Sequence, residues 1–191
     1  GVLHDKQGNI VSPLYPKAAA RVGALASAID VGQLDICIGL RNPASFLKSA
    51  YSQALMSGKP IGFSEYLAKN PLSQINWQGL VARIRSAVGV GHVTVWLFED
   101  YTRQFSNICK VLMGDFVDIK IVPISNYVHR GLSGRAVASI LAQPEADDPR
   151  HLAAKARATY PVSDDYPAFD PFSCVDKVSS QEEYAAQLAV I

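Results

Sequence analysis

Residues 34–51 read LDICIGLRNPASFLKSAY, and this stretch decides the fold class. Its first part, Leu34 to Leu40, is a short apolar run that is typical of a β-strand buried on both faces. The run stops at Arg41, and Asn42 and Pro43 then supply an N-cap and a first-turn proline for a helix. The stretch therefore predicts a strand, an abrupt polar turn and a helix.

The alternation of helix and strand continues on both sides of this stretch. Apolar residues at three- and four-residue intervals predict helices over 16–29, 78–88 and 101–113, and a second apolar run predicts a strand over 93–98. Connections of this length join parallel strands, so we expect an α/β fold with a parallel β-sheet flanked by helices. Residues 117–124 fit either a third strand or an irregular connection.

The remaining elements are shorter or lie after a change of composition at Pro123. A short helix is expected over 63–70 with Ser64 as its N-cap, and Ser133 is a good N-cap for a helix that follows it. Further helices are expected over 149–159 and 179–190, the second opened by a Ser–Glu capping box. We expect a single domain over 1–191, in which residues 144–191 form a peripheral loop and the closing helix.

Composition excludes several classes of protein. The 191 residues are 49% hydrophobic and carry a formal net charge of +1, which favours a globular chain and argues against a broad basic face for nucleic acid. No run of eighteen apolar residues is present that would span a bilayer. The three cysteines and four histidines lack the spacing of a disulfide framework or a metal site, so no metal is expected. Few cysteines and no visible targeting segment favour a cytoplasmic location.

Arg41 carries the most specific chemistry in the sequence. It stands where the first strand ends, which is where open α/β sheets bind ligands, and the next helix aims free backbone N–H groups and its positive dipole end at the same space. Ser49 lies eight residues on, about two turns, and so projects from nearly the same face. An arginine fork and a hydroxyl at that spacing can grip one phosphate. The alternative is an arginine in an ion pair and a serine that faces solvent.

The segment Arg41-Asn42-Pro43, with Ser49 and Tyr51, resembles the R-[ND]-P-x5-S-x-Y signature of the sulfotransferase family. In that family the signature binds the 3′-phosphate of the donor PAPS (3′-phosphoadenosine 5′-phosphosulfate). The resemblance implies a P-loop NTPase-like fold, with Arg41 and Ser49 as 3′-phosphate ligands and Tyr51 in a mostly structural role. It also implies transfer of a sulfuryl group from PAPS to a hydroxyl or amine acceptor, with PAP as the product.

The resemblance spans roughly residues 15–141 and is specific over 38–51. FSEYL at 63–67 resembles the family's F-x-x-[YF]-L helix, and VTVWLFEDY at 93–101 resembles a later strand that ends in acidic residues. By this analogy the adjacent carboxylates that end the second segment are structural, rather than the paired acids of a glycosidase.

The segment that begins at Arg130 admits two alignments with the family. One is the R-K-G-x-x-G loop, which also touches the 3′-phosphate, and the other is an [NR]-x-L-S segment that opens a C-terminal helix. We favour the second because Ser133 is a good N-cap, which leaves Arg130 as an additional candidate phosphate contact.

The chain departs from the family where a P-K-[ST]-G-[ST]-[ST] phosphate loop is expected. Here Lys17 is followed by three alanines, which supply neither the glycine for close backbone approach nor hydroxyls for the oxygens. We therefore interpret Lys17 as a helix-surface lysine and expect the phosphate loop and the catalytic base to precede Gly1 in a longer polypeptide. His4 is the candidate base within the chain, and a solvent-exposed loop histidine is the alternative.

Two other functions stay open at this point. One is a catalytically silent nucleotide-binding or interaction module of the same fold, and the other is a different P-loop phosphotransferase. The expected partner is a small-molecule or glycan acceptor, with no nucleic acid and no membrane segment, and the residues assign neither the acceptor nor an oligomeric state.

Overall fold

The computed structural model describes residues 3–6, 9–30, 32–114 and 131–191. Within them, β1 (Leu34–Leu40) and β2 (Val90–Leu97) pair in parallel, with Ile38 opposite Val95 and Gly39 opposite Trp96. The expected α/β class with a parallel pair of strands is confirmed, although β2 begins at Val90 rather than Val93. The possible strand over 117–124 lies outside the described residues.

Helices flank this pair of strands and make up most of the residues that the structure describes. They are α1 (Ala18–Ala28), α2 (Pro43–Met56), α3 (Phe63–Lys69), α4 (Trp77–Arg85), α5 (Tyr101–Met113), α6 (Gly134–Leu141), α7 (Pro149–Thr159) and α8 (Cys174–Leu188). Two short 3-10 turns, η1 (Leu72–Gln74) and η2 (Phe98–Asp100), precede α4 and α5. None of the helices in the described part of the chain is long and apolar enough to cross a membrane.

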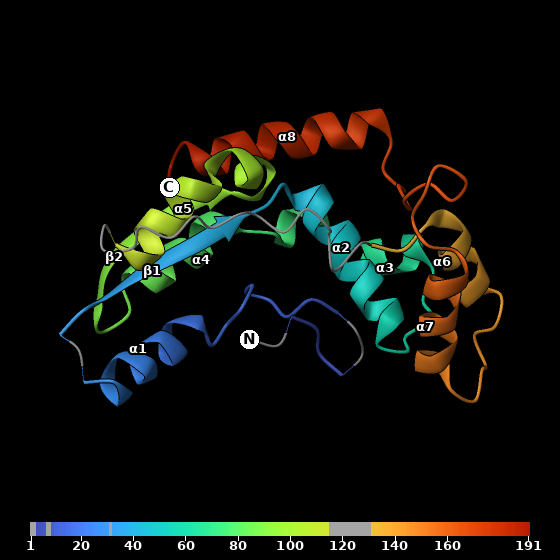
Figure 1. Ribbon diagram of the computed structural model, residues 1–191, viewed down its shortest axis with the longest axis horizontal. Coiled ribbons are helices and arrows are strands. Elements are labelled where there is room, and N and C mark those ends of the chain that lie inside the picture. Colours follow the sequence, from blue (N-terminus) through green and yellow to red (C-terminus); the bar gives the residue numbers. More distant parts are fainter. Residues whose placement is uncertain (1–2, 7–8, 31, 115–130) are drawn as a thin grey trace.

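The α2 helix runs through the middle of the molecule (Figure 1). The sheet lies toward one end with α1, α4 and α5, and α3, α6 and α7 lie toward the other end. Helix α8 lies along one edge of the molecule, from the end that holds the sheet to α2, and contacts both α2 and α4. The buried face of α2 forms the centre of the core, with side chains that are at most 1% exposed: Leu47, Ala50, Tyr51, Ala54 and Leu55.

The two faces of the sheet differ. Alternate strand residues, among them Ile38 and Val95, pack against the core, and α1 and α4 contact β2. On the other face the Trp96 side chain lies across Gly39, and a Cβ atom at Gly39 would come within 2.6 Å of the indole ring. Glycine at this position therefore allows the indole to lie flat on the neighbouring strand.

The helix α2 begins as the sequence predicts. The Asn42 side chain accepts hydrogen bonds from the backbone N–H groups of Ala44 and Ser45, and Pro43 occupies the first turn. The N-cap expected at Ser133 is also present, because its hydroxyl accepts from the backbone N–H of Ala136. These caps depend on residues close together in the chain, which is why the pattern alone locates them.

Two helix starts differ from the expectation. Helix α3 begins at Phe63 with Gly62 in the N-cap position, so Ser64 lies inside the helix. Helix α8 begins at Cys174, where Ser173 and Asp176 form the capping box, so the expected start at residue 179 is wrong. The Ser173–Asp176 pair caps the first N–H groups of the helix. The helix therefore begins about one and a half turns before residue 179.

The segment 144–191 packs into the body of the molecule. Ala153 on α7, Phe172 in the loop and Tyr184 on α8 belong to the same buried cluster as α2, with exposed fractions of 0%, 7% and 2%. A segment expected to be peripheral thus supplies part of the core, and α8 brings polar side chains to the start of α2.

Candidate functional site

The turn between β1 and α2 is held from three directions. The Trp77 indole N–H donates to the Arg41 carbonyl oxygen at 2.8 Å, and the Asn42 backbone N–H donates to the Glu99 carboxylate at 2.8 Å. Glu99 lies in η2, directly after β2, so the turn joins the carboxyl ends of both strands. The Asn42 side chain also accepts from the Ser180 hydroxyl at 3.1 Å. The turn is therefore fixed by residues from α4, η2 and α8.

The first N–H groups of α2 are already paired, contrary to the expectation that they would be free. Ala44 donates to both the Asn42 side chain and the Ser180 hydroxyl, each at 3.0 Å, and Ser45 donates to the Asn42 side chain at 3.3 Å. Pro43 has no N–H group to offer. This end of α2 therefore offers an anion side chains and the helix dipole, rather than backbone donors.

The Arg41 guanidinium lies half-buried beside this turn. Its Nε donates to the Ser45 hydroxyl at 2.8 Å, and its Cζ lies 4.5 Å from the centroid of the Phe98 ring. Burial lowers the pKa of the guanidinium, and the nearby Glu99 carboxylate opposes that effect. Among the described residues its two terminal amino groups have no hydrogen-bond partner, so both are available to an anionic oxygen.

Two lysines lie next to the start of α2. Lys177 Nζ lies 2.6 Å and Lys48 Nζ 3.7 Å from the carboxylate of Asp170, and the hydrogen bond from Lys177 lowers the pKa of that carboxyl. These residues, with Asn42 and Ser45, line a cavity of about 230 Å³. With Arg41 bonded to Ser45 at its edge and Glu99 bonded to the Asn42 N–H, three cations lie beside two carboxylates, which leaves a net positive charge at this end of α2.

Ser49 lies one turn further along α2 and faces a different cavity. That cavity has a volume of about 350 Å³, and its lining includes Ser49, Ser52, Met56 and Arg157 but not Arg41. The Arg41 guanidinium is bonded to Ser45, four residues or about 6 Å of helix short of Ser49. The structure thus places the two predicted phosphate ligands on the same side of α2 but does not bring the guanidinium to the Ser49 hydroxyl.

Tyr51, the third residue of the signature, is completely buried. Its hydroxyl donates to the Ile61 carbonyl oxygen at 2.9 Å, and its ring packs against those of Phe63, Tyr66 and Phe169 with centroids 5.1 to 5.5 Å apart. Burial raises the pKa of this hydroxyl to about 12. This placement fits the structural role that the resemblance implies for it.

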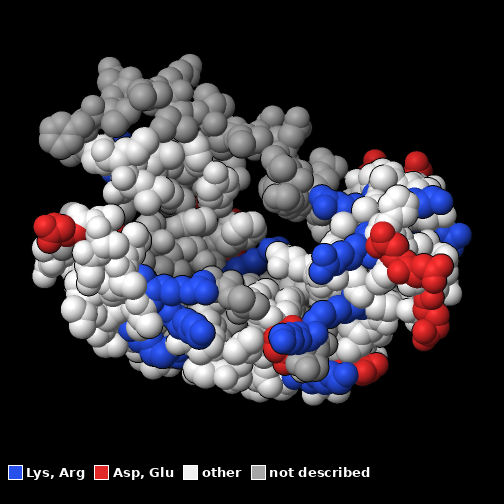
Figure 2. Space-filling view, turned by 90° about the horizontal axis from the view of Figure 1, so that it is seen from below, with Lys and Arg blue, Asp and Glu red and all other residues white. Residues whose placement is uncertain are grey.

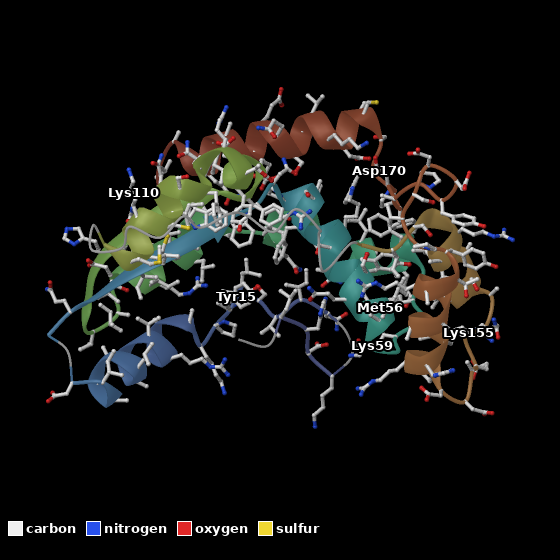
Figure 3. The ribbon with its side chains drawn as sticks, viewed as in Figure 1. Tyr15, Met56, Lys59, Lys110, Lys155 and Asp170 are labelled. Carbon is white, nitrogen blue, oxygen red and sulfur yellow. The ribbon has the colours of Figure 1, made fainter. Side chains whose placement is uncertain are left out.

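His4 is half-buried rather than exposed to solvent, so the alternative of a solvent-exposed loop histidine is wrong. Its Nε2 lies 2.9 Å from the hydroxyl oxygen of the buried Tyr66. Lys59 lies beside the same N-terminal segment (Figure 3), and its ammonium group donates to the carbonyl oxygens of Asp5 and Lys6. Burial is the main cause that lowers the pKa of His4, Lys59 lowers it further, and Asp5 opposes both.

This lowered pKa predicts a loss of stability in mild acid. Because the unfolded chain takes up the His4 proton more readily than the folded chain, stability is greatest above the ordinary histidine pKa, near 6.5, and falls as the pH falls below it. Urea unfolding between about pH 7.5 and 5 measures this, and His4→Gln is expected to flatten the curve in that window. His92→Gln, at an exposed histidine, is the control. Equal curves for wild type and His4→Gln would contradict the assignment.

Two further residues that the sequence analysis considered are Lys17 and Arg130. Lys17 is exposed at the start of α1, as expected of a helix-surface lysine, whereas Arg130 lies outside the described residues. Among the residues that are described, no three His, Cys, Asp or Glu side chains are grouped to hold a metal ion. The sequence does not predict that Arg157 lines the same cavity as Ser49. The two residues lie on different helices, and no motif or spacing in the sequence connects them.

No protein-family model matches this chain, and comparisons with curated proteins and with solved structures give no match. Its function is therefore inferred from the residues of the site and from the resemblance carried by residues 38–51.

Proposed function

We propose that this chain is a PAPS-dependent sulfotransferase domain of P-loop NTPase-like fold. It would transfer a sulfuryl group from PAPS to the hydroxyl or amine of a small-molecule or glycan acceptor. The observation that carries the proposal is the position of Arg41 within the sequence RNPASFLKSAY. Its guanidinium stands at the carboxyl end of a parallel strand, with two terminal amino groups that no described residue occupies.

The residues around Arg41 fit the anionic nucleotide. The 3′-phosphate would be bound by the Arg41 fork, with Lys48 and the dipole of α2 adding to the positive potential. Asn42 holds the turn through Glu99, so the guanidinium starts from a fixed backbone. Ser49, two turns along α2, would meet the same nucleotide only through its own cavity, as a second point of contact.

In the proposed reaction the acceptor oxygen or nitrogen attacks sulfur in line, and the bond from sulfur to the phosphate oxygen of PAP breaks. A base takes the acceptor proton. The transferring group is nearly planar, so catalysis rests mainly on positioning and charge stabilisation, as in phosphoryl transfer. Arg41 would bind the nucleotide through its 3′-phosphate, which is remote from the reacting sulfur. It would therefore affect donor binding more than the chemical step.

Arg41→Ala is therefore expected to weaken PAP binding about tenfold or more, because charge-assisted hydrogen bonds to phosphate are lost. Isothermal titration calorimetry with PAP measures the change. Arg85→Ala, which removes an exposed arginine from α4, is the matched control, and thermal unfolding checks that each variant is folded. Unchanged PAP affinity in Arg41→Ala would remove the basis of the proposal.

Parallel transfer assays separate the proposal from its alternatives. The chain is incubated with radiolabelled PAPS or ATP and a panel of phenol, alcohol, amine and sugar acceptors. Transfer from PAPS supports a sulfotransferase, and transfer from ATP alone indicates another P-loop phosphotransferase. PAP binding without transfer from either donor indicates a catalytically silent nucleotide-binding module.

A further inference from the structure

A row of three serines that ends at a methionine runs along one side of α2 beyond Arg41. Ser45, Ser49, Ser52 and Met56 follow at intervals of four, three and four residues, which places them above one another on the helix. The first hydroxyl is taken by Arg41, whereas the next two line the cavity of about 350 Å³. The hydroxyl row thus has a cation at its start and an open cavity at its end.

Arg157 reaches this cavity from α7, which packs against α2. It is the one charged side chain among the described residues that line the cavity, and no Asp or Glu accompanies it there. Arg157 is half-buried, yet within the described part of the chain it makes no hydrogen bond or ion pair. A guanidinium that has lost part of its water and gained no partner is stabilised by a bound anion.

The neighbours of Arg157 define which anion fits. The Ser49 hydroxyl and the Gln53 amide offer uncharged donors, and the Ser52 hydroxyl, which bonds the Lys48 carbonyl oxygen at 3.2 Å, lies in the same wall. Met56 adds an apolar surface. A cavity of this volume is at the lower end of the range for small-molecule sites and exceeds what a bare ion needs.

One face of the molecule carries many basic side chains. Figure 2 shows Lys and Arg side chains gathered on both sides of a hollow in one face of the molecule, with fewer Asp and Glu side chains at its edge. Such an arrangement raises the local concentration of anions before binding.

We propose that this cavity is a binding site for a phosphate monoester, with Arg157 as its charged ligand. The guanidinium fork binds two phosphate oxygens, the Ser49 hydroxyl donates to a third, and Met56 contacts the organic group. The site does not require sulfuryl transfer. The same chemistry is offered by a phosphate of PAP that Arg41 does not hold and by a phosphorylated acceptor, and the two sources are separated by experiment.

Calorimetric titration uses PAP, AMP, which lacks the 3′-phosphate, and glucose 6-phosphate as probes. Arg157→Ala is expected to weaken at least one of these about tenfold or more, Arg157→Lys less, and Ser49→Ala several-fold. Lys155→Ala is the matched control, because Lys155 lies two residues away on α7, about 200° around the helix, and is exposed (Figure 3). Thermal unfolding checks that each variant is folded.

The outcomes separate this inference from the proposed function. Loss of PAP binding in both Arg41→Ala and Arg157→Ala places the donor's phosphate in the cavity, while loss of glucose 6-phosphate binding in Arg157→Ala alone places a phosphorylated acceptor there. Loss of probe binding in Arg157→Ala with PAP binding intact in Arg41→Ala retains the site and removes the sulfotransferase proposal. The site is excluded if wild type binds none of the probes, or if Arg157→Ala binds them all like wild type.

Discussion

Trp77→Ala is expected to lower the free energy of unfolding by about 3–5 kcal/mol, the usual cost of removing a buried aromatic side chain. Trp77 is 3% exposed, and its ring packs edge-on against Phe46 with centroids 4.9 Å apart. Its indole N–H also binds the Arg41 carbonyl oxygen. The substitution therefore leaves a cavity beneath α2 and also frees the turn that carries Arg41.

Urea unfolding of three variants separates these two effects. Trp77→Phe retains most of the apolar contact but leaves the Arg41 carbonyl without its donor, at a cost of about 1–3 kcal/mol. Trp96→Ala, at a partly exposed tryptophan on the other face of the sheet, is the matched control and is expected to cost less than Trp77→Ala. A loss for Trp77→Ala no greater than for Trp96→Ala would show that Trp77 does not support the turn.

Tyr51→Ala is expected to cost a similar amount, about 3–5 kcal/mol, because it removes a ring that is completely buried among three other aromatic rings. Tyr51→Phe keeps the ring and leaves the Ile61 carbonyl oxygen unpaired, so about 1–3 kcal/mol is expected. If the residue is structural, Tyr51→Phe leaves PAP affinity at the wild-type value, although stability falls.

The measurements are urea unfolding and PAP calorimetry on the same protein samples. Tyr166→Phe is the control, because the Tyr166 hydroxyl has no hydrogen-bond partner among the described residues and its removal is expected to change neither quantity. A Tyr51→Phe variant of normal stability and weakened PAP affinity would instead place the Tyr51 hydroxyl in contact with ligand.

How well the sequence predicts a structural element depends on how far apart in the chain the residues that form it lie. Strand β1, the Asn42 cap and helix α5 were predictable because periodicity and capping act over a few neighbouring residues. The start of α8 was not, since Ser173 and Asp176 cap a stretch that shows little amphipathic periodicity. Residues 173–179 are exposed, so this part of the helix carries no buried apolar face that a periodicity could reveal, although its cap is local.

The candidate site also combines features that depend on consecutive residues with contacts between distant segments. The sequence by itself determined that Arg41 follows a strand and precedes a capped helix, because these features depend on consecutive residues. Only the tertiary structure decided what the side chains meet: η2, directly after β2, brings Phe98 to the Arg41 guanidinium, and α7 brings Arg157 to the cavity of Ser49. Such contacts join residues that are far apart in the chain, so they are fixed by how the helices pack on the sheet and not by the spacing of a motif.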